Sequence, residues 1–242
     1  MARRRRRGRP GRVRGGGAAR MAAPGCPARP PPPRPVAATA LGGDKVLPGD
    51  PSAGAQDRAA ALRGGTRLHL LLEHLPGTAR EGWPARAAAL LAGTEDGVPT
   101  RAELAALLDD LAAIVEAEAL GDVFAPPPGA QVLREVPLTA PLPGGGRLTG
   151  VIDRLIVTDQ GVTAIDYKSN AVVPADAGGT PSGYLRQMAA YRHALRAIWP
   201  GRRIDTAILW TAARELMALP DALLDEAWDA ALRDLDPERG RS

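Results

Sequence analysis

The feature that most constrains the fold of this chain is a pair of β-branched segments separated by a short turn. Residues 148–157 and 162–168 are rich in Val, Ile and Thr, and they flank the turn segment Thr158–Gly161. Such segments favour β-strands, in which successive side chains point to opposite faces. The pattern therefore predicts a β-hairpin whose second strand carries Asp166 and Lys168 on the same face.

The register of this hairpin decides whether Asp166 meets a second acid, Asp153. A two-residue loop pairs Thr158 with Gly161 and sets Asp153 opposite Asp166, with Cβ atoms about 5 Å apart. If Gly161 is instead a bulge residue in the left-handed region, the register slips by one and the two acids no longer face each other. The turn sequence alone is compatible with both registers, and shared metal binding by the two acids favours the first.

Two acids and a lysine on neighbouring strands have a functional and a plain structural interpretation. Mg²⁺ is commonly held by one or two carboxylates together with waters and substrate phosphate oxygens, so the pattern suits attack on a phosphodiester. Solvated edge residues with a cross-strand ion pair would give the same pattern. The apolar residues Val151-Ile152 and Leu155–Val157 indicate a strand buried on both faces, where acids need compensating partners.

The first 35 residues differ sharply in composition from the rest. They carry eleven arginines, no acid, and many prolines and glycines, including Pro30–Pro33. A segment of this kind buries too little apolar surface to fold, so we predict a disordered arm over 1–35 and one folded domain over 36–242. The arm has two interpretations: it binds nucleic acid through phosphates, or it is an upstream extension, with Met21 as another start.

The remaining chain is acidic. The whole sequence has 31 basic and 27 acidic residues, so 20 and 27 remain without the eleven arginines of the arm, a net charge of −7. A DNA-binding domain of this charge needs either a local basic groove or another polypeptide that delivers the substrate. Cys26 is the only cysteine, which excludes an iron–sulfur cluster held by this chain's own thiolates. No segment predicts a secretory signal or a membrane span.

The 36–242 region predicts an α/β fold. Hydrophobic periodicity predicts helices at about 57–75, 100–120, 184–199 and 221–235, and strands near 131–139 and 203–211 in addition to the hairpin. Thr100-Arg-Ala-Glu103 has the spacing of a capping box, and Gly121 is expected to end the helix that begins there. The order of the elements predicts a sheet flanked by helices.

Three motifs follow one another along the chain: Gly150-x-x-Asp153, Ile165-Asp-Tyr-Lys168 and Gln187-Met-Ala-Ala-Tyr191. Together they resemble the RecB-type branch of the PD-(D/E)XK nuclease superfamily. Leu41–Pro48, Gly65–Pro76 and Leu209-Trp-Thr211 extend the resemblance over about 35–235. Within that branch the chain resembles the C-terminal nuclease domain of AddA-type helicase–nucleases, which process double-strand breaks. The resemblance implies a restriction-endonuclease-like core with a central mixed sheet, a helical part at about 57–120 and a catalytic α/β core at about 131–235.

The resemblance also implies roles for individual residues. Asp153 and Asp166 would be metal ligands and Lys168 the catalytic lysine. His69 and the backbone carbonyl of Tyr167 would complete the metal site, which would hold Mg²⁺, with Mn²⁺ as an alternative. A histidine on a leucine-rich helix is usually a core or boundary residue, which is the alternative for His69.

Further candidates lie around this set. Gln187 and Tyr191, one helical turn apart, would contact the substrate or support the site, although Tyr191 also falls on an apolar stripe. Glu73, one turn after His69, is a candidate to orient that histidine, and Glu135 lies near another acidic position of such domains. Three arginines, Arg186, Arg192 and Arg196, would touch phosphates or form a solvated face.

The function implied is that of a metal-dependent deoxyribonuclease acting on single-stranded DNA ends during double-strand break repair and recombination. Its partners would be a helicase motor and an AddB-type subunit, and its expected location is the bacterial cytoplasm. The chain lacks the Gly-x-x-x-x-Gly-Lys-Ser/Thr phosphate loop, so we expect no helicase or ATPase activity and interpret it as a detached or truncated nuclease end. The alternative is a catalytically silent module that docks on a helicase or nuclease partner.

Overall fold

The computed structural model describes residues 34–45, 55–95, 97–170 and 172–236. The chain divides into two units, Met1–Pro32 and Pro33–Ser242, and the described residues all belong to the second. Apart from its last two residues, the predicted arm over 1–35 lies outside the described residues, so the boundary at residue 36 stays a prediction. No helix in the described part has the length and apolar character that crossing a membrane requires.

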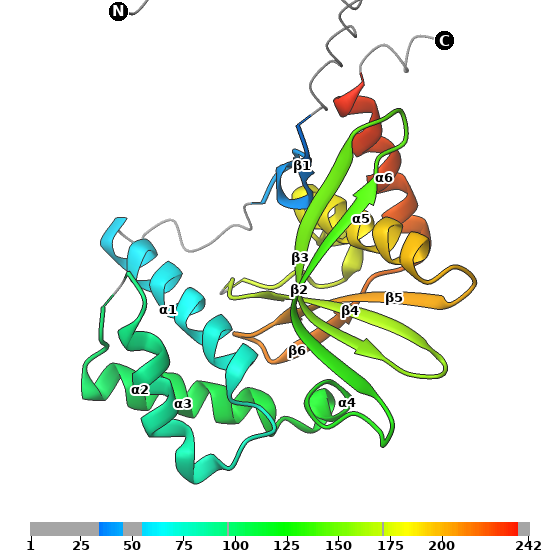
Figure 1. Ribbon diagram of the computed structural model, residues 1–242. Helices are drawn as coiled ribbons and strands as arrows, with labels where there is room; N and C mark the ends of the chain where they lie inside the picture. The colour runs from blue at the N-terminus through cyan, green and yellow to red at the C-terminus, as the bar shows by residue number, and fades with distance from the viewer. Residues whose placement is uncertain (1–33, 46–54, 96, 171, 237–242) are drawn as a thin grey trace, which may run out of the picture. The chain divides into compact units, whose positions relative to one another are not determined.

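A six-stranded mixed sheet lies at the centre of the fold (Figure 1). Its strands are β1 (Val36–Ala37), β2 (Gln131–Pro141), β3 (Arg147–Val157), β4 (Gly161–Lys168), β5 (Arg203–Trp210) and β6 (Glu215–Ala218). Strand β3 runs antiparallel to β2 and β4, β4 runs parallel to β5, and β6 pairs antiparallel with β5. The predicted mixed sheet flanked by helices is confirmed. Strands β1 and β6 escape sequence prediction because they are too short to show a period.

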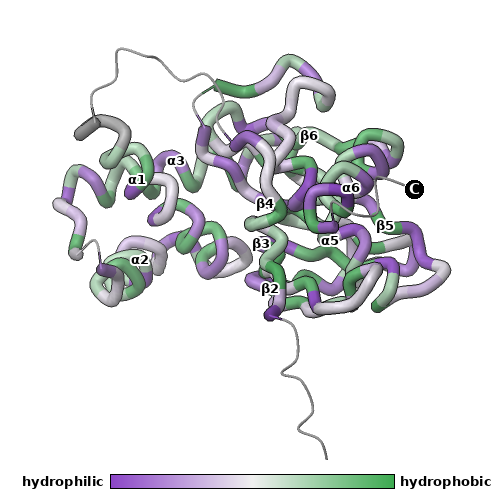
Figure 2. The backbone as a smooth tube through the Cα atoms, turned by 90° about the horizontal axis from the view of Figure 1, so that it is seen from above, coloured by the Kyte–Doolittle hydropathy of each residue, from purple (hydrophilic) through white to green (hydrophobic). Residues whose placement is uncertain are grey.

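The helices form two groups around the sheet. Their bounds are α1 (Ala55–His74), α2 (Trp83–Ala92), α3 (Arg101–Val115), α4 (Gly121–Phe124), α5 (Ser182–Ile198) and α6 (Asp221–Leu235), with short 3₁₀ turns η1 (Ala38–Ala40), η2 (Arg80–Gly82), η3 (Glu118–Leu120) and η4 (Ala177–Gly179). The view in Figure 2 places α1, α2 and α3 on one side of the strands and α5 and α6 on the other.

The start of α3 is confirmed and its predicted end is wrong. The Thr100 side chain accepts a hydrogen bond from the Glu103 N–H, and the Glu103 carboxylate accepts one from the Thr100 N–H, which is the predicted capping box. The helix ends at Val115 instead of about 120, and Gly121 begins α4 instead of ending α3. The intervening turn allows Leu120 to pack fully buried in the core.

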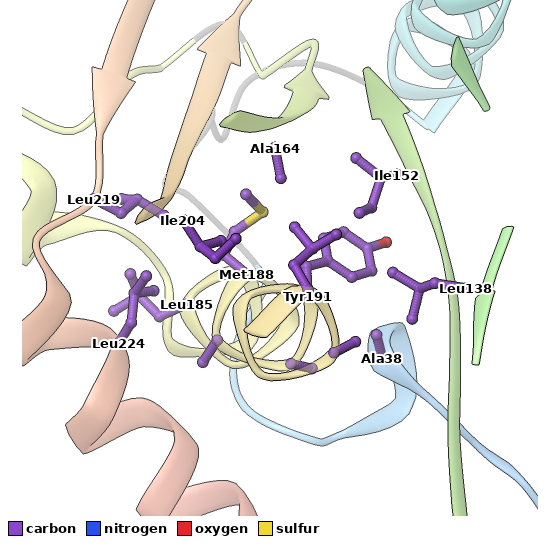
Figure 3. Close-up of a cluster of buried hydrophobic side chains, with 14 of the residues drawn as sticks. Ala38, Leu138, Ile152, Ala164, Leu185, Met188, Tyr191, Ile204, Leu219 and Leu224 are labelled. Carbon is purple, nitrogen blue, oxygen red and sulfur yellow. The ribbon is translucent and has the colours of Figure 1, made fainter. Parts of the chain in front are cut away.

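Two hydrophobic clusters form the core, one on each face of the sheet. One lies between the sheet and α5, and Figure 3 shows part of it around Met188 and Tyr191. The other lies between the sheet and α1, α2 and α3. Strand β4 serves both clusters by alternation, since Ala164 faces the first and Ile165 faces the second. This double burial explains why β4 is almost continuously apolar apart from the residues discussed below.

The hairpin has the register of the two-residue loop. The β3–β4 ladder runs from Val157↔Val162 to Arg154↔Ile165, and the Thr158 N–H donates to the Gly161 carbonyl at 2.9 Å. Gly161 is not in the left-handed region, so the alternative with a bulge at Gly161 is wrong. Asp153 and Asp166 lie one place beyond the last ladder pair, where this register continued would set them opposite each other.

Strand β3 changes partner along one of its edges. Strand β4 pairs with this edge at 154–157, whereas the parallel strand β1 pairs with it at Leu148 and Thr149. Strand β2 runs along the opposite edge over the whole length of β3. The stretch 150–153 therefore has no strand on this edge among the described residues, and the sheet opens there. Val151, expected to be buried, is 42% exposed at this opening.

Candidate active site

A pocket of about 510 Å³ lies where the sheet opens. The residues of its lining come from β1, η1, α1, β3, β4 and α5, which are widely separated in sequence. The lining includes seven of the residues that the sequence singles out: His69, Asp153, Asp166, Tyr167, Lys168, Gln187 and Tyr191. The fold therefore brings the main sequence motifs together on one surface.

Asp166 is the most deeply buried acid of this pocket, with 2% of its surface exposed. Its Oδ2 lies 2.5 Å from the Nζ of Lys168, and its Oδ1 accepts a hydrogen bond from Gln187 Nε2 at 2.7 Å. A buried carboxylate is strongly unfavourable without such partners. The two contacts explain how the fold tolerates this acid.

Lys168 stays charged in this environment. Burial alone would lower the pKa of Lys168, but the charge and hydrogen bond of Asp166, with Asp153 beyond it, more than offset burial and raise the pKa overall. The ammonium also lies 4.5 Å from the centre of the Tyr184 ring, a cation–π contact. A lysine held in its charged form stabilises negative charge and is unsuited to act as a general base.

Tyr184 is a site residue that sequence reasoning misses, because its position on the apolar stripe of α5 predicts only a core role. The spacing along α5 could have indicated that Tyr184 lies near the site. Tyr184 precedes Gln187 by three residues and Tyr191 by seven, so all three share one face of the helix.

The Asp153 carboxylate accepts a hydrogen bond from a backbone N–H of β4 at the point where the β3–β4 ladder has ended. The donor is the Tyr167 N–H, at 2.6 Å. Burial, followed by repulsion from Asp166, raises the pKa of Asp153 to about 8, although the Tyr167 N–H and Lys168 act in the opposite direction. A carboxyl group that is unfavourable as an anion gains free energy from binding a cation.

Gln187 and Tyr191 form a support behind Asp166. The Gln187 Nε2 also lies within hydrogen-bond distance of the Tyr191 hydroxyl, at 2.9 Å. The Tyr191 hydroxyl donates to the carbonyl of Val151 at 2.5 Å, on the open edge of β3. The Tyr191 ring packs in the core with Leu138 and Ile152 around it (Figure 3). Tyr191 is therefore both a core residue and a support of the site.

Gly150 makes room for this support. A Cβ atom at position 150 would lie 2.7 Å from Cε1 of the Tyr191 ring, closer than two carbon atoms can approach. The glycine of the Gly150-x-x-Asp153 motif is thus required by the close approach of helix α5 to β3.

His69 projects from α1 and is half-buried. Its ring meets Tyr167 edge-on, with 5.6 Å between the ring centres. Burial lowers the pKa of His69, with Asp166 opposing, and its Nε2 is buried without a hydrogen-bond partner in the described part of the protein. A neutral imidazole with a free buried nitrogen is the form that binds a metal ion.

Glu73 and Glu135 do not line the pocket. Glu73 lies 3.5 Å from His74 and makes no contact with His69 among the described residues, so the structure gives it another neighbour than the predicted one. Glu135 is exposed, has the unusual φ of 46° and occupies the β2 position in register with Asp153. Partial burial, then repulsion from Glu73 and Asp166, raises the pKa of Glu135. Both acids add negative charge near the pocket.

The three arginines of α5 all pair with acids of α6, and Arg196 is exposed, as a solvated face would have it. Arg192 is 3% exposed and pairs with Asp221 at 2.7 Å and with Asp225. Arg196 pairs with Asp221 at 3.0 Å, and Arg186 pairs with Asp234 on the same helix α6 at 2.6 Å. These arginines hold α6 against α5 and do not line the pocket. A local basic groove, one of the two alternatives that the acidic charge leaves open, is not built from these arginines.

The donor atoms suit a hard divalent cation. Asp153, Asp166 and the carbonyl of Tyr167 offer oxygen ligands, and the partnerless His69 nitrogen lines the same pocket. No three His, Cys, Asp or Glu side chains within the described ranges form a ready metal cluster. Each aspartate instead has an internal partner, the Lys168 ammonium or the Tyr167 N–H. Mg²⁺ needs only one or two protein carboxylates with waters and substrate oxygens, so this set fits it.

Residues 47–235 match the family model of the PD-(D/E)XK nuclease superfamily. The match spans most of the chain and ends with α6, so the chain belongs to this superfamily. It does not distinguish a RecB-type or AddA-type branch within it.

Solved structures and curated sequences add little to this assignment. The crystal structure of SSO0001 is similar over 75% of this chain and 87% of its own, with 13% identity and a TM-score of 0.29, which is too low to carry an argument. No curated protein matches the chain at a significant level.

Proposed function

We propose that this chain is a metal-dependent nuclease that hydrolyses DNA phosphodiester bonds at the pocket of Asp153, Asp166 and Lys168. One observation carries the proposal. In a member of the PD-(D/E)XK superfamily, a buried Asp166 lies 2.5 Å from a charged Lys168, and a second, half-buried acid, Asp153, accepts a hydrogen bond from the Tyr167 N–H between them. Acids and an ammonium held together in this way suit a substrate that brings both phosphate and a divalent cation.

The residues of the pocket have different roles in this reaction. Asp153, Asp166 and the Tyr167 carbonyl, with His69, would hold Mg²⁺, with Mn²⁺ as the alternative. When bound, such an ion polarises the phosphoryl oxygen and lowers the pKa of the attacking water. Lys168, which keeps its charge, stabilises the negative charge that develops on the phosphoryl oxygens.

Two further residues keep this arrangement in place. Gln187 fixes the orientation of the Asp166 carboxylate through its hydrogen bond to Oδ1. Tyr191 links Gln187 to the Val151 carbonyl on β3, so that the acid is held from α5 as well as from its own strand. Preorganised positioning of this kind lowers the reorganisation needed in the transition state.

The finer assignment rests on the sequence resemblance. It makes single-stranded DNA ends the substrate, double-strand break repair and recombination the process, and an AddA-like nuclease end the closest description. A helicase motor and an AddB-type subunit would supply the substrate in the bacterial cytoplasm. The acidic charge of the chain outside residues 1–35 supports delivery by a partner, because a protein with net negative charge attracts DNA poorly on its own.

A catalytically silent docking module is the second candidate. It is favoured by the internal partners of the two aspartates, since Lys168 and the Tyr167 N–H already compensate their charge. A protein of this kind would keep the site residues without turning over a substrate.

Cleavage of end-labelled single-stranded DNA by the whole chain, in Mg²⁺ or in EDTA, tests the proposal. We expect cleavage only with the metal and its loss in Asp166→Asn. Asp159→Asn is the matched control, because Asp159 is exposed in the turn of the same hairpin and should leave cleavage unchanged. A folded wild-type protein that cuts with neither Mg²⁺ nor Mn²⁺ would contradict the nuclease proposal and favour the docking module.

A further inference from the structure

A second pocket, of about 350 Å³, lies beside the proposed active site between α1, α3 and the turn that joins β5 to β6. It begins where β4 ends: Ser169, which follows Lys168, lines it. Thr211, another lining residue, donates its N–H to the Lys168 carbonyl at 2.9 Å and its hydroxyl at 3.3 Å. The wall of this pocket is therefore tied to the backbone of the proposed catalytic lysine.

Two glycines in the middle of α1 border this pocket. Glycine in a helix interior costs about 0.5–1 kcal/mol relative to alanine, so each one needs a reason. Gly65 has one, because a Cβ there would lie 2.3 Å from Ser169 Oγ. Gly64 has no such reason, since a Cβ there would meet no atom of the described residues within 4 Å. Packing does not require this glycine, but its missing side chain keeps the pocket open.

The lining combines an apolar wall with polar groups. Leu68 and Ile114 are buried core residues, and Leu107 is half-buried. At the exposed end stands Arg214, whose guanidinium makes no hydrogen bond or ion pair with the residues that the structure describes. Asp110 adds a carboxylate, which repels phosphate but accepts hydrogen bonds from the N–H groups of a nucleobase.

We propose that this pocket binds one nucleotide of the substrate strand next to the bond that is cut. The base would lie against the apolar wall of α1 and α3, and a phosphate would meet Arg214. That the bound nucleotide belongs to a DNA strand that this protein cuts rests on the proposed nuclease function. The pocket in turn makes single-stranded DNA the substrate class, because a base must leave its pair and its stack before it can enter a pocket.

Binding of thymidine 5′-monophosphate to the whole chain in EDTA tests the proposal, measured by a ligand-observed NMR titration. Gly64→Leu fills the pocket with a strong helix former, and Arg214→Gln removes the cation. We expect Arg214→Gln to weaken binding at least about tenfold, the effect of losing one charge-assisted contact of 1.4 kcal/mol or more. Gly64→Leu should weaken binding similarly, because its side chain would occupy the space of the base. Ala60→Leu on the exposed part of α1 and Arg147→Gln at the exposed start of β3 are matched controls that should bind as wild type.

Several outcomes would overturn the proposal. The proposal is wrong if the wild-type protein does not bind the nucleotide. It is also wrong if Arg214→Gln and Gly64→Leu both bind the nucleotide as tightly as wild type, provided that thermal unfolding shows Gly64→Leu to be folded. If the Gly64→Leu variant does not fold, nucleotide binding by Arg214→Gln alone decides whether the proposal holds.

Cleavage of single-stranded DNA in Mg²⁺, measured on the same preparations, separates this proposal from the nuclease function. Cleavage by wild type with unchanged nucleotide binding in both pocket variants would reject the nucleotide pocket and leave the nuclease function standing. In the opposite case, wild type binds the nucleotide, both variants lose this binding, and wild type does not cleave DNA. This result would reject the nuclease function and support the nucleotide pocket.

Discussion

The side-chain amide of Gln187 holds one oxygen of the buried Asp166 carboxylate at 2.7 Å. Because Gln187 belongs to α5 and Asp166 to β4, this bond couples the position of a helix to that of an acid in the sheet. The other oxygen of Asp166 faces Lys168 at 2.5 Å. The carboxylate is thus fixed from both sides, as a site that must present it to a cation and a phosphate requires.

Replacing Gln187 by Leu should weaken activity without removing it. The variant leaves the Asp166–Lys168 pair in place but frees the carboxylate to rotate, and outer partners of metal ligands are typically worth about 10–100-fold in metal affinity or activity. Cleavage rates measured over a range of Mg²⁺ concentrations should show a higher Mg²⁺ requirement. Gln131→Leu, at the exposed start of β2, is the control. An unchanged Mg²⁺ dependence in Gln187→Leu would show that Gln187 does not orient Asp166.

Replacing Gly150 by Ala should destabilise the protein and disturb the site together. The new methyl group would lie 2.7 Å from the Tyr191 ring, which holds Gln187 through its hydroxyl. Overpacking of a core costs about 1–3 kcal/mol, and urea unfolding measures it. Gly121→Ala is the control, because a methyl group there would meet no atom within 4 Å in the part of the chain that the structure describes. Equal stability of the two variants would mean that β3 and α5 separate easily at this point.

The stability of the metal-free protein should fall as the pH rises. Folding raises the pKa of Asp153 from 3.8 to about 8, chiefly by burial and then by repulsion from Asp166. Between about pH 4 and 8 the folded protein therefore binds more protons than the unfolded chain, and its free energy of unfolding decreases with increasing pH. Mg²⁺ should counteract the loss at the alkaline end, since it favours the ionised form of Asp153.

Urea unfolding in EDTA at pH 5 and pH 8 measures this effect. Asp153→Asn keeps an acceptor for the Tyr167 N–H but cannot ionise, so it should lose less stability than wild type between the two pH values. Asp159→Asn, in the exposed turn, should follow wild type. The same loss in wild type and in Asp153→Asn would contradict the raised pKa.

Local sequence patterns were sufficient to predict the elements that carry the site. The β-branched segments on either side of Thr158–Gly161 predict the hairpin, and Thr100 with Glu103 predicts the start of α3, because both depend on residues close in sequence. The turn leaves two registers open, and the expectation that the two acids share a metal favours the one that the structure has. The i, i+4 spacing of Gln187 and Tyr191 likewise predicted that they would be neighbours, and the structure joins them by a hydrogen bond.

Features that depend on distant segments could not be predicted in this way. The opening of the sheet arises because β1 and β4 pair with the same edge of β3 at different places, and β1 has only two residues. The burial of Arg192 depends on Asp221 and Asp225, some thirty residues later on α6. Helix α2 was missed because its short apolar stretch has neither a side-chain cap nor acids in its first turn to mark its start.

The most direct test of the central claim is the single-turnover rate of single-stranded DNA cleavage by Lys168→Met, measured in Mg²⁺ on the whole chain. Loss of one preorganised charge typically lowers the rate about 10²–10³-fold, or roughly 3–4 kcal/mol, and we predict a fall of this size. Arg203→Met removes an exposed positive charge that does not line the pocket and lies beside the start of β4, whereas Lys168 ends that strand, so this variant should leave the rate unchanged. A folded Lys168→Met variant that cuts as fast as wild type would contradict the assignment of this pocket as the active site.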